Sequence, residues 1–275
     1  VDLDEYKIIY DNLNSSSSIA SLITFPKKID NTQPKTLLHI KSNNYNISKP
    51  VIGVIGAGNF TKSVVIPNLI HTKAKIKCIA SSQGLSSTYL AKKYNFDYST
   101  TDYLNILNDE DVNTIIITTK HDSHAKLVRE SLSNGKNVFV EKPLAINNNQ
   151  LEDIIKIFNS KKSSTLMVGF NRRFSPHAKE IKKIIGNSLE PVNIIANMNA
   201  GFVAEDNWVN KENIGGGRII GEACHLIDLC IFFTNSLVTS ICMNSMKNEG
   251  LNEGSILIQF SNDSNAVINY FTNGS

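Results

Sequence analysis

The sequence predicts an α/β protein in which a doubly wound parallel sheet is followed by a second, α+β domain with a largely antiparallel sheet. Three observations support this. From residue 50 to about 170, continuous apolar runs alternate with helix-like segments, as buried parallel strands require. The first of these runs ends in a glycine-rich turn. Beyond residue 171 the apolar runs are short and separated by Gly, Asn and Asp, which favours antiparallel pairing.

Composition agrees with a globular protein of this size. The chain has 275 residues, which favours two domains, and its net charge of +3 is too even to indicate a nucleic-acid partner. A small-molecule partner is therefore expected. The four cysteines form no C-x-x-C pair, which predicts buried free thiols, and no run of about 20 apolar residues is present to span a membrane. A cytoplasmic protein without a membrane partner is predicted.

We divide the chain into residues 1–49, 50–170 and 171–275. The first segment has a predicted helix from Tyr6 to Leu13 and no chemical motif. In the second, the strand-like runs are "PVIGVIG", "KIKCIASS", "NTIIITT", "NVFVEK" and "STLMVGF", with helix-like segments between them. In the third, the strands are expected in "VNIIANMNA", "LVTSICMNS", "GSILIQFS" and "NAVINYFT".

The glycine-rich turn predicts a dinucleotide site. Gly56 and Gly58 follow the first strand, and Asn59 and Phe60 open the next helix. Glycines at such a turn let a pyrophosphate approach the free N–H groups of a helix N-terminus. Thr61 occupies the place of the third glycine of the usual pattern. The alternative is a pair of turn glycines in an α/β protein that binds no nucleotide.

Four further polar residues follow neighbouring strands. Ser81 and Ser82 stand where an NAD-specific site would offer an acid to the ribose, and no arginine stands there for a 2′-phosphate. The choice between NAD and NADP therefore stays open. Thr118 and Thr119 lie where a nicotinamide ribose is expected. His124 either faces the same crevice or is a hydrogen-bonded histidine at a helix N-terminus.

Several motifs together resemble one family of oxidoreductases. They are "GAGNFTKSVVIPNL", "HDSHAKLVRESLSNGKNVFVEKPLA", "LMVGFNRRFSP" and "GGGRIIGEACHLIDL", in this order over residues 50–275. They are similar to the NAD(P)-dependent glucose-fructose oxidoreductase / inositol dehydrogenase / MocA (Gfo/Idh/MocA) family. The stretch "NAGFVAEDNWVNKENIGGGRIIGEACHLIDL" most resembles bi-domain oxidoreductases with an upstream zinc-type alcohol dehydrogenase module. The resemblance implies that residues 1–49 are the tail of that module and that the chain is truncated at both ends.

The resemblance implies a catalytic role for Lys142 in "EKP". An ammonium at this strand end would contact the nicotinamide and the substrate, hydrogen-bond the reacting hydroxyl and polarise the carbonyl that forms. Glu141 would orient Lys142 or contact the cofactor. The alternative is a lysine at a strand end that pairs with Glu141 in solvent.

The family pattern also implies a His with an Asp four residues before it. His225 matches the histidine as a general acid/base, but Gly221 occupies the Asp position. Asp228 matches another acid of the family and could orient His225 instead, whereas Glu222 would point about 100° further round a helix. The alternative for His225 is a satisfied core histidine. No paired ligand spacing indicates a metal site.

Four residues are candidates for substrate contact: Arg172, Arg173, Trp208 and Glu222. The resemblance implies hydride transfer between NAD or NADP and a secondary alcohol of a sugar, polyol or sugar nucleotide. It also allows NAD-assisted elimination or glycoside cleavage. A dinucleotide-binding sensor without activity is a third possibility, which Gly221 keeps open. In this family the C-terminal sheet often serves self-association, so a homo-oligomer is expected.

Overall fold

The computed structural model describes residues 2, 5–11, 22–24, 35–46, 48–161, 163–186, 190–245 and 252–274. The chain divides into two compact units, residues 1–35 and residues 36–275. The first contains helix α1 (Tyr6–Asp11) and an isolated bridge between Asp2 and Thr24. Leu13, the predicted end of this helix, lies outside the described residues.

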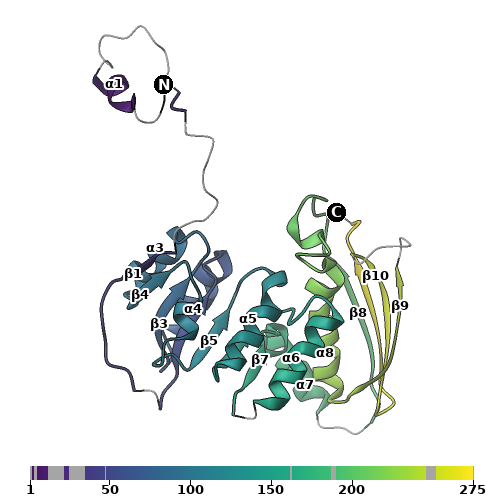
Figure 1. The fold of residues 1–275 in the computed structure, drawn as a ribbon. Coiled ribbons are helices and arrows are strands. Elements are labelled where there is room, and N and C mark those ends of the chain that lie inside the picture. The colour runs from purple at the N-terminus through teal and green to yellow at the C-terminus, as the bar shows by residue number, and fades with distance from the viewer. Residues whose placement is uncertain are drawn as a thin grey trace. The chain divides into compact units, whose positions relative to one another are not determined.

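The second unit begins with a seven-stranded sheet in the order β1-β4-β3-β2-β5-β6-β7 (Figure 1). All pairings are parallel except that of β1 with β4. The strands are β1 (Leu37–His39), β2 (Val51–Ile55), β3 (Lys75–Ala80), β4 (Tyr98–Thr100), β5 (Thr114–Ile117), β6 (Asn137–Val140) and β7 (Leu166–Val168). This confirms the predicted doubly wound sheet.

Helices connect the parallel strands. They are a π-helical turn (Thr61–Val65) with α2 (Ile66–Leu69), α3 (Leu85–Tyr94), α4 (Leu104–Leu107), α5 (His121–Ser133) and α6 (Asn148–Ser160). β2 is buried along its whole length, because the connecting helices cover both faces of the sheet. Asn147 caps the N-terminus of helix α6, because its side chain accepts a hydrogen bond from the N–H of Gln150 at 3.0 Å.

Residues 36–49, placed in the N-terminal segment by sequence, are part of this unit. Strand β1 pairs with β4 at the edge of the sheet. The buried carboxylate of Asp97 then holds the following chain, accepting hydrogen bonds from Asn43 Nδ2 at 2.6 Å and the Tyr45 hydroxyl at 2.9 Å. These contacts make residues 36–49 part of the compact unit that begins at residue 36.

A four-stranded sheet follows, in the order β8-β11-β10-β9. Its strands are β8 (Asn193–Asn199), β9 (Val238–Ser245), β10 (Gly254–Phe260) and β11 (Asn265–Phe271). β8 and β11 are parallel, and the other pairings are antiparallel. Helix α7 (Pro176–Ile185) precedes β8, and helix α8 (Cys224–Thr234) lies between β8 and β9 in the chain. A π-helical turn (Ile219–Ala223) leads into α8.

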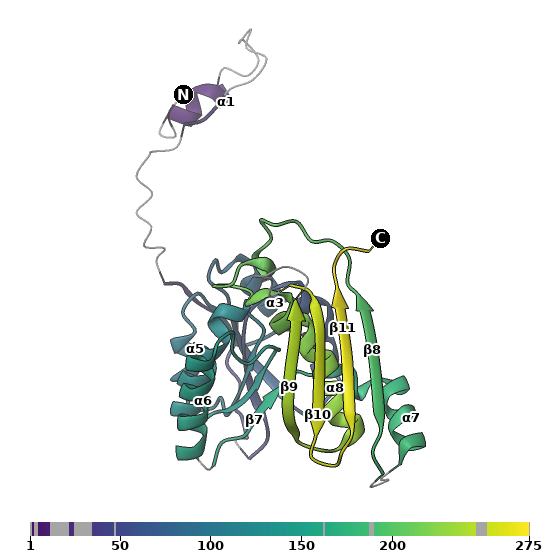
Figure 2. The same cartoon turned by 90° about the vertical axis from the view of Figure 1, so that its right-hand side faces the viewer.

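One face of this sheet packs on α8, and the opposite face is open (Figure 2). On the packed face lie buried side chains such as Ile256, Ile268 and Tyr270. On the open face, Leu257 is 52% exposed and Ile195 is 74% exposed.

All four cysteines are free thiols, as predicted. Cys78 and Cys230 are buried, but Cys242 is exposed on β9, unlike the buried position expected. Among the described residues, the structure has no helix with the length and apolar character needed to cross a bilayer.

Gly53 in the middle of β2 gives a test of the packing. A Cβ built there would lie far inside van der Waals contact with Cγ2 of Ile106 and 3.2 Å from Cγ1 of Val112. We expect Gly53→Ala to lower the free energy of unfolding by about 1–3 kcal/mol, because overpacking forces the neighbours from their rotamers. Urea denaturation measures this.

The matched control is Gly58→Ala, since a Cβ at that glycine meets no atom within 4 Å. Equal stability of the two variants would contradict the tight packing of β2 against α4.

Candidate active site

Several of the residues predicted from the sequence lie together at the carboxyl ends of β5 and β6. A cavity of about 330 Å³ lies there. Such a crevice at the carboxyl edge of a parallel sheet is where ligands of doubly wound proteins bind. The lining residues come from the glycine turn, the β5 and β6 ends and the second domain: Phe60, Thr118, Thr119, His121, His124, Glu141, Lys142, Asn171 and His225.

The glycine turn fits a dinucleotide. Gly56 has φ +116°, and a Cβ there would lie 2.8 Å from the Thr118 carbonyl oxygen, so only glycine suits the position. Gly58 instead borders open space, which leaves its backbone accessible to a ligand. Thr61, at the third position of the pattern, is fully buried, and its hydroxyl lies 2.7 Å from that of Thr118. This threonine therefore ties the turn to the end of β5.

The two serines after β3 lie apart from the cavity-lining residues. The Ser81 hydroxyl donates to that of Ser87 at 2.9 Å, and the Ser82 side chain is exposed. The structure thus places hydroxyls, and neither a carboxylate nor a guanidinium, at these two positions. Contact of Ser81 and Ser82 with a cofactor stays a prediction, as does that of Asn59, which is exposed beside Phe60.

Lys142 follows β6 and reaches the turn before α8. Its ammonium donates a hydrogen bond to the carbonyl oxygen of Gly221 at 2.6 Å. This contact differs from the alternative in which Lys142 pairs with Glu141 in solvent at the end of the strand. Glu141 beside it is part-buried, and burial raises the pKa of its carboxyl group, with Lys142 acting in the opposite direction.

His124 lines the cavity but is fully buried. Its Nδ1 lies 2.8 Å from the Pro143 carbonyl oxygen, and Nε2 lies 3.1 Å from that of Thr119. His124 thus joins the backbone after β5 to the turn after Lys142. These contacts agree with the alternative that His124 is a hydrogen-bonded histidine near a helix N-terminus. Contact of His124 with a cofactor stays a prediction.

His225 is the second residue of α8, which directly follows the π-helical turn that contains Gly221. Its Nδ1 is buried and has no hydrogen-bond partner among the described residues. Burial, together with the positive charges of Lys142 and Arg172, lowers the pKa of His225 to about 4. The imidazole is therefore neutral at physiological pH and can accept a proton.

The structure does not bring the predicted orienting acids to His225 Nδ1. Asp228 forms a two-point ion pair with Arg173, in which Arg173 Nε donates at 2.9 Å. Glu222 accepts hydrogen bonds from the Tyr270 hydroxyl and, at 3.3 Å, from Arg218. Glu222 is directed away from His225, as expected. Asp228 pairs with Arg173 and does not orient His225 in place of the acid that Gly221 replaces.

The two arginines after β7, in "GFNRRFSP", make different contacts. Arg173 holds Asp228 and lies over the Phe232 ring, whereas Arg172 donates to Met198 Sδ at 3.7 Å and acts electrostatically on His225. Trp208 packs its ring edge-on against His121, with centroids 4.9 Å apart. Substrate contact by Arg172, Arg173, Trp208 or Glu222 stays a prediction.

His121 and Asn171 line the cavity but are not among the residues predicted from the sequence. His121 begins α5, is 8% exposed, and lines the cavity with Lys142 and His225. A usable signal was present, because His121 is only two residues beyond Thr119, which was assigned to the site. The contact that holds its ring was not visible in the sequence, because Gly215 is 94 residues away.

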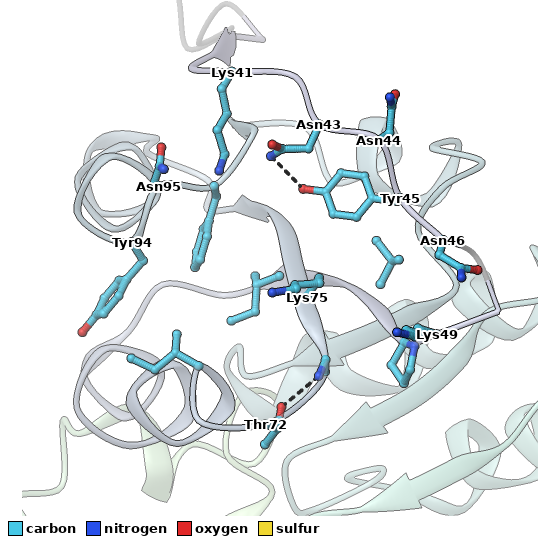
Figure 3. Close-up of a pocket in the computed structure, with 16 residues that line it drawn as sticks. Lys41, Asn43, Asn44, Tyr45, Asn46, Lys49, Thr72, Lys75, Tyr94 and Asn95 are labelled. Atoms are coloured by element: carbon cyan, nitrogen blue, oxygen red, sulfur yellow. Dashed lines mark hydrogen bonds between the residues drawn. The ribbon is translucent and has the colours of Figure 1, made fainter.

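A larger cavity, of about 550 Å³, lies at the opposite edge of the sheet. Val51 and Lys75, which begin β2 and β3, contribute to it. Its labelled side chains are mainly amides and lysines, among them Lys41 and Lys49 (Figure 3). We place the chemistry in the smaller cavity, because Lys142 and the neutral His225 converge there.

Comparison with known proteins agrees with this geometry. Residues 51–170 match the model of the GFO_IDH_MocA family, oxidoreductases with an NAD-binding Rossmann fold. Over these residues the chain is similar to the NAD-binding domain of that family. Over 193 residues the chain is 30% identical to the oxidoreductase YrbE of Bacillus subtilis (strain 168), covering 70% of this chain and 55% of YrbE. The chain thus spans about half the length of that relative.

Solved structures of similar fold cover both sheets. The myo-inositol dehydrogenase of Lactobacillus casei, in complex with NAD(H) and myo-inositol, matches with a TM-score of 0.67 and 20% identity over 82% of this chain and 68% of that one. A 3-ketoreductase of Actinomadura kijaniata, in complex with NADP and TDP-benzene, matches with a TM-score of 0.69 and 16% identity over 82% and 71%. These likenesses show the fold: a Rossmann sheet followed by a second, mostly antiparallel sheet.

We expect Gly58→Val to abolish dinucleotide binding. The side chain would fill the open space by which a pyrophosphate approaches the turn, without clashing inside the protein. Calorimetric titration with NAD and NADP measures the loss, and an unchanged melting temperature of the free variant shows that the fold is intact. Wild-type affinity in the variant would contradict the assignment of this turn.

Proposed function

We propose that the protein is an NAD(P)-dependent oxidoreductase that transfers a hydride between nicotinamide and a secondary alcohol of a sugar, polyol or sugar nucleotide. The observation that carries this proposal is the meeting of Lys142 and neutral His225 in one cavity, beside the glycine turn. An ammonium and an unprotonated imidazole are the two groups that oxidation of an alcohol needs, one to polarise oxygen and one to take its proton.

The hydrogen bond to Gly221 positions the Lys142 ammonium for this role. Of its three N–H donors, one is used by Gly221, which fixes the direction of the ammonium and leaves two for a substrate oxygen. A bound nicotinamide would supply the hydride acceptor. The positive charge of Lys142 then stabilises the negative charge that grows on the substrate oxygen as its proton leaves.

His225 is placed to take that proton. Its pKa of about 4 keeps it unprotonated before the reaction, so its lone pair is available. Phe170 packs edge-on against the ring, with centroids 6.2 Å apart, and limits its rotation. Because no carboxylate contacts Nδ1 among the described residues, the imidazolium would be stabilised by a substrate group or by water.

The sensor hypothesis and NAD-assisted cleavage make different predictions for turnover. A sensor would bind dinucleotide and oxidise no alcohol. A cleaving enzyme would turn over substrate without net reduction of NAD. Lys142 and His225 in one cavity favour net hydride transfer.

We expect Lys142→Met to lower kcat by about 10²- to 10⁴-fold, with little change in dinucleotide affinity, because the ammonium acts on the transition state. His225→Asn should be similarly slow, and the double variant clearly less than additive, since both groups serve one proton transfer. NADH or NADPH formation is measured with a panel of alcohols that includes myo-inositol.

Lys92→Met, at an exposed position on α3, is the matched control and should keep wild-type kcat. Near-normal kcat in Lys142→Met would overturn the assignment. Dinucleotide binding without turnover of any alcohol by the wild type would favour the sensor.

We also propose that the protein self-associates through the open face of the four-stranded sheet. Leu257 lies opposite Cys242 and Val267, and Val267 lies opposite Ile195, so these side chains form one row across the sheet. A row of exposed apolar side chains gains from burial against a second copy.

We expect Leu257→Asp to shift the protein toward monomer in light scattering after gel filtration, because the carboxylate would be buried in the interface. Leu85→Asp, at an 81% exposed position on α3, is the control and should leave the mass unchanged. A monomeric wild type, or an unchanged mass for Leu257→Asp, would contradict the proposal.

A further inference from the structure

His121 is a buried histidine in which one ring nitrogen, Nδ1, is hydrogen-bonded and the other, Nε2, is left for a ligand. Nδ1 lies 2.8 Å from the carbonyl oxygen of Gly215, in the loop that precedes α8. A carbonyl oxygen only accepts, so Nδ1 carries the proton and donates. A second proton on the ring is opposed by burial and by Lys142, and the pKa of His121 is lowered to about 4. Nε2 is therefore an unprotonated acceptor.

Gly221 makes room for this ring. A Cβ built on Gly221 would lie 3.1 Å from Cε1 of His121, closer than ordinary van der Waals contact. The carbonyl of the same Gly221 accepts the hydrogen bond of Lys142. One residue therefore places both the ammonium and the second imidazole at the cavity.

Trp208 fixes the ring from another side. Its edge-on contact with His121 has centroids 4.9 Å apart, and Lys120 Nζ lies 5.7 Å from the centroid of the Trp208 ring. His121 lines the cavity, and its ring is held by the Nδ1 contact with Gly215 and by Trp208, so Nε2 is the ring nitrogen left for a ligand there.

We propose that His121 is a specificity-determining residue whose Nε2 accepts a hydrogen bond from a second hydroxyl of the substrate, next to the oxygen held by Lys142. The proposal rests on the proposed oxidoreductase function. It follows that the substrate is a polyhydroxylated compound. An alcohol that lacks the second hydroxyl, or has a carbonyl or ether oxygen there, would leave the Nε2 lone pair unpaired.

A purely structural role is the rival explanation, since His121 also fastens the loop at Gly215. His121→Asn separates the two. The Asn amide nitrogen takes the place of Nδ1 and keeps a donor for the Gly215 carbonyl, but the variant has no group in the place of Nε2. If His121 serves only to hold the loop at Gly215, this variant should resemble the wild type in activity, substrate discrimination and stability.

The experiment compares wild type, His121→Asn and the matched control His177→Asn, whose histidine is exposed on α7. The substrate panel pairs myo-inositol and D-glucose with a deoxy analogue of each, and dinucleotide affinity and melting temperature are measured alongside. For His121→Asn we expect kcat/KM on the parent polyol to fall by roughly 10- to 100-fold, the loss typical of an unpaired buried hydrogen bond.

Three further results are expected. Discrimination between the parent polyol and one of its deoxy analogues should largely disappear in His121→Asn, while dinucleotide affinity and melting temperature stay near wild type. Gly221→Ala, which presses on Cε1, should lose kcat/KM in the same direction but by less. Nitrogen-15 NMR of the wild type at pH 7 should show His121 protonated at Nδ1, with the Nε2 resonance moving on addition of myo-inositol.

Unchanged kcat/KM and unchanged discrimination in His121→Asn, with an active wild type, would overturn the inference and leave the proposed function standing. A wild type that binds dinucleotide but neither oxidises any polyol of the panel nor shows a shift of Nε2 would overturn both.

Discussion

The hydrogen bond from Lys142 to the carbonyl of Gly221 is the constraint on which the site depends. It joins the end of β6 to the turn before α8, two points 79 residues apart in the chain. Lys142 belongs to the parallel sheet that holds the dinucleotide turn, and Gly221 leads into the helix that packs on the second sheet. This bond therefore helps to set the separation between the groups after β6 and those on α8.

The parallel sheet and Lys142 were predictable from the sequence because their signals are local. Apolar runs, the glycines after β2 and the charge at the end of β6 each show within a few residues. Strand β1 left no such signal, since it has three residues, all exposed, and is defined by its pairing with β4. The boundary near residue 36 depends on that pairing and on Asp97, which no local pattern reveals.

The surroundings of His225 were not predictable for a different reason. The expectation for Gly221 and Asp228 assumed a regular α-helix, but residues 219–223 form a wider, π-helical turn, and such turns occur often at functional sites. Asp228 then meets Arg173, which comes from the segment after β7. His121 was missed because its neighbours, Gly215, Trp208 and Gly221, come together only through tertiary structure.

The position of Asp97 limits where this protein can be cut for expression. A clone beginning at Pro50, just before the first long apolar run, would remove Asn43 and Tyr45 and leave the Asp97 carboxylate, only 3% exposed in the intact chain, without either donor. It would also remove β1 and uncover the backbone of β4 along the sheet edge, which invites pairing with other molecules. Lower solubility of such a clone would reflect this lost edge rather than a defect at the cofactor turn.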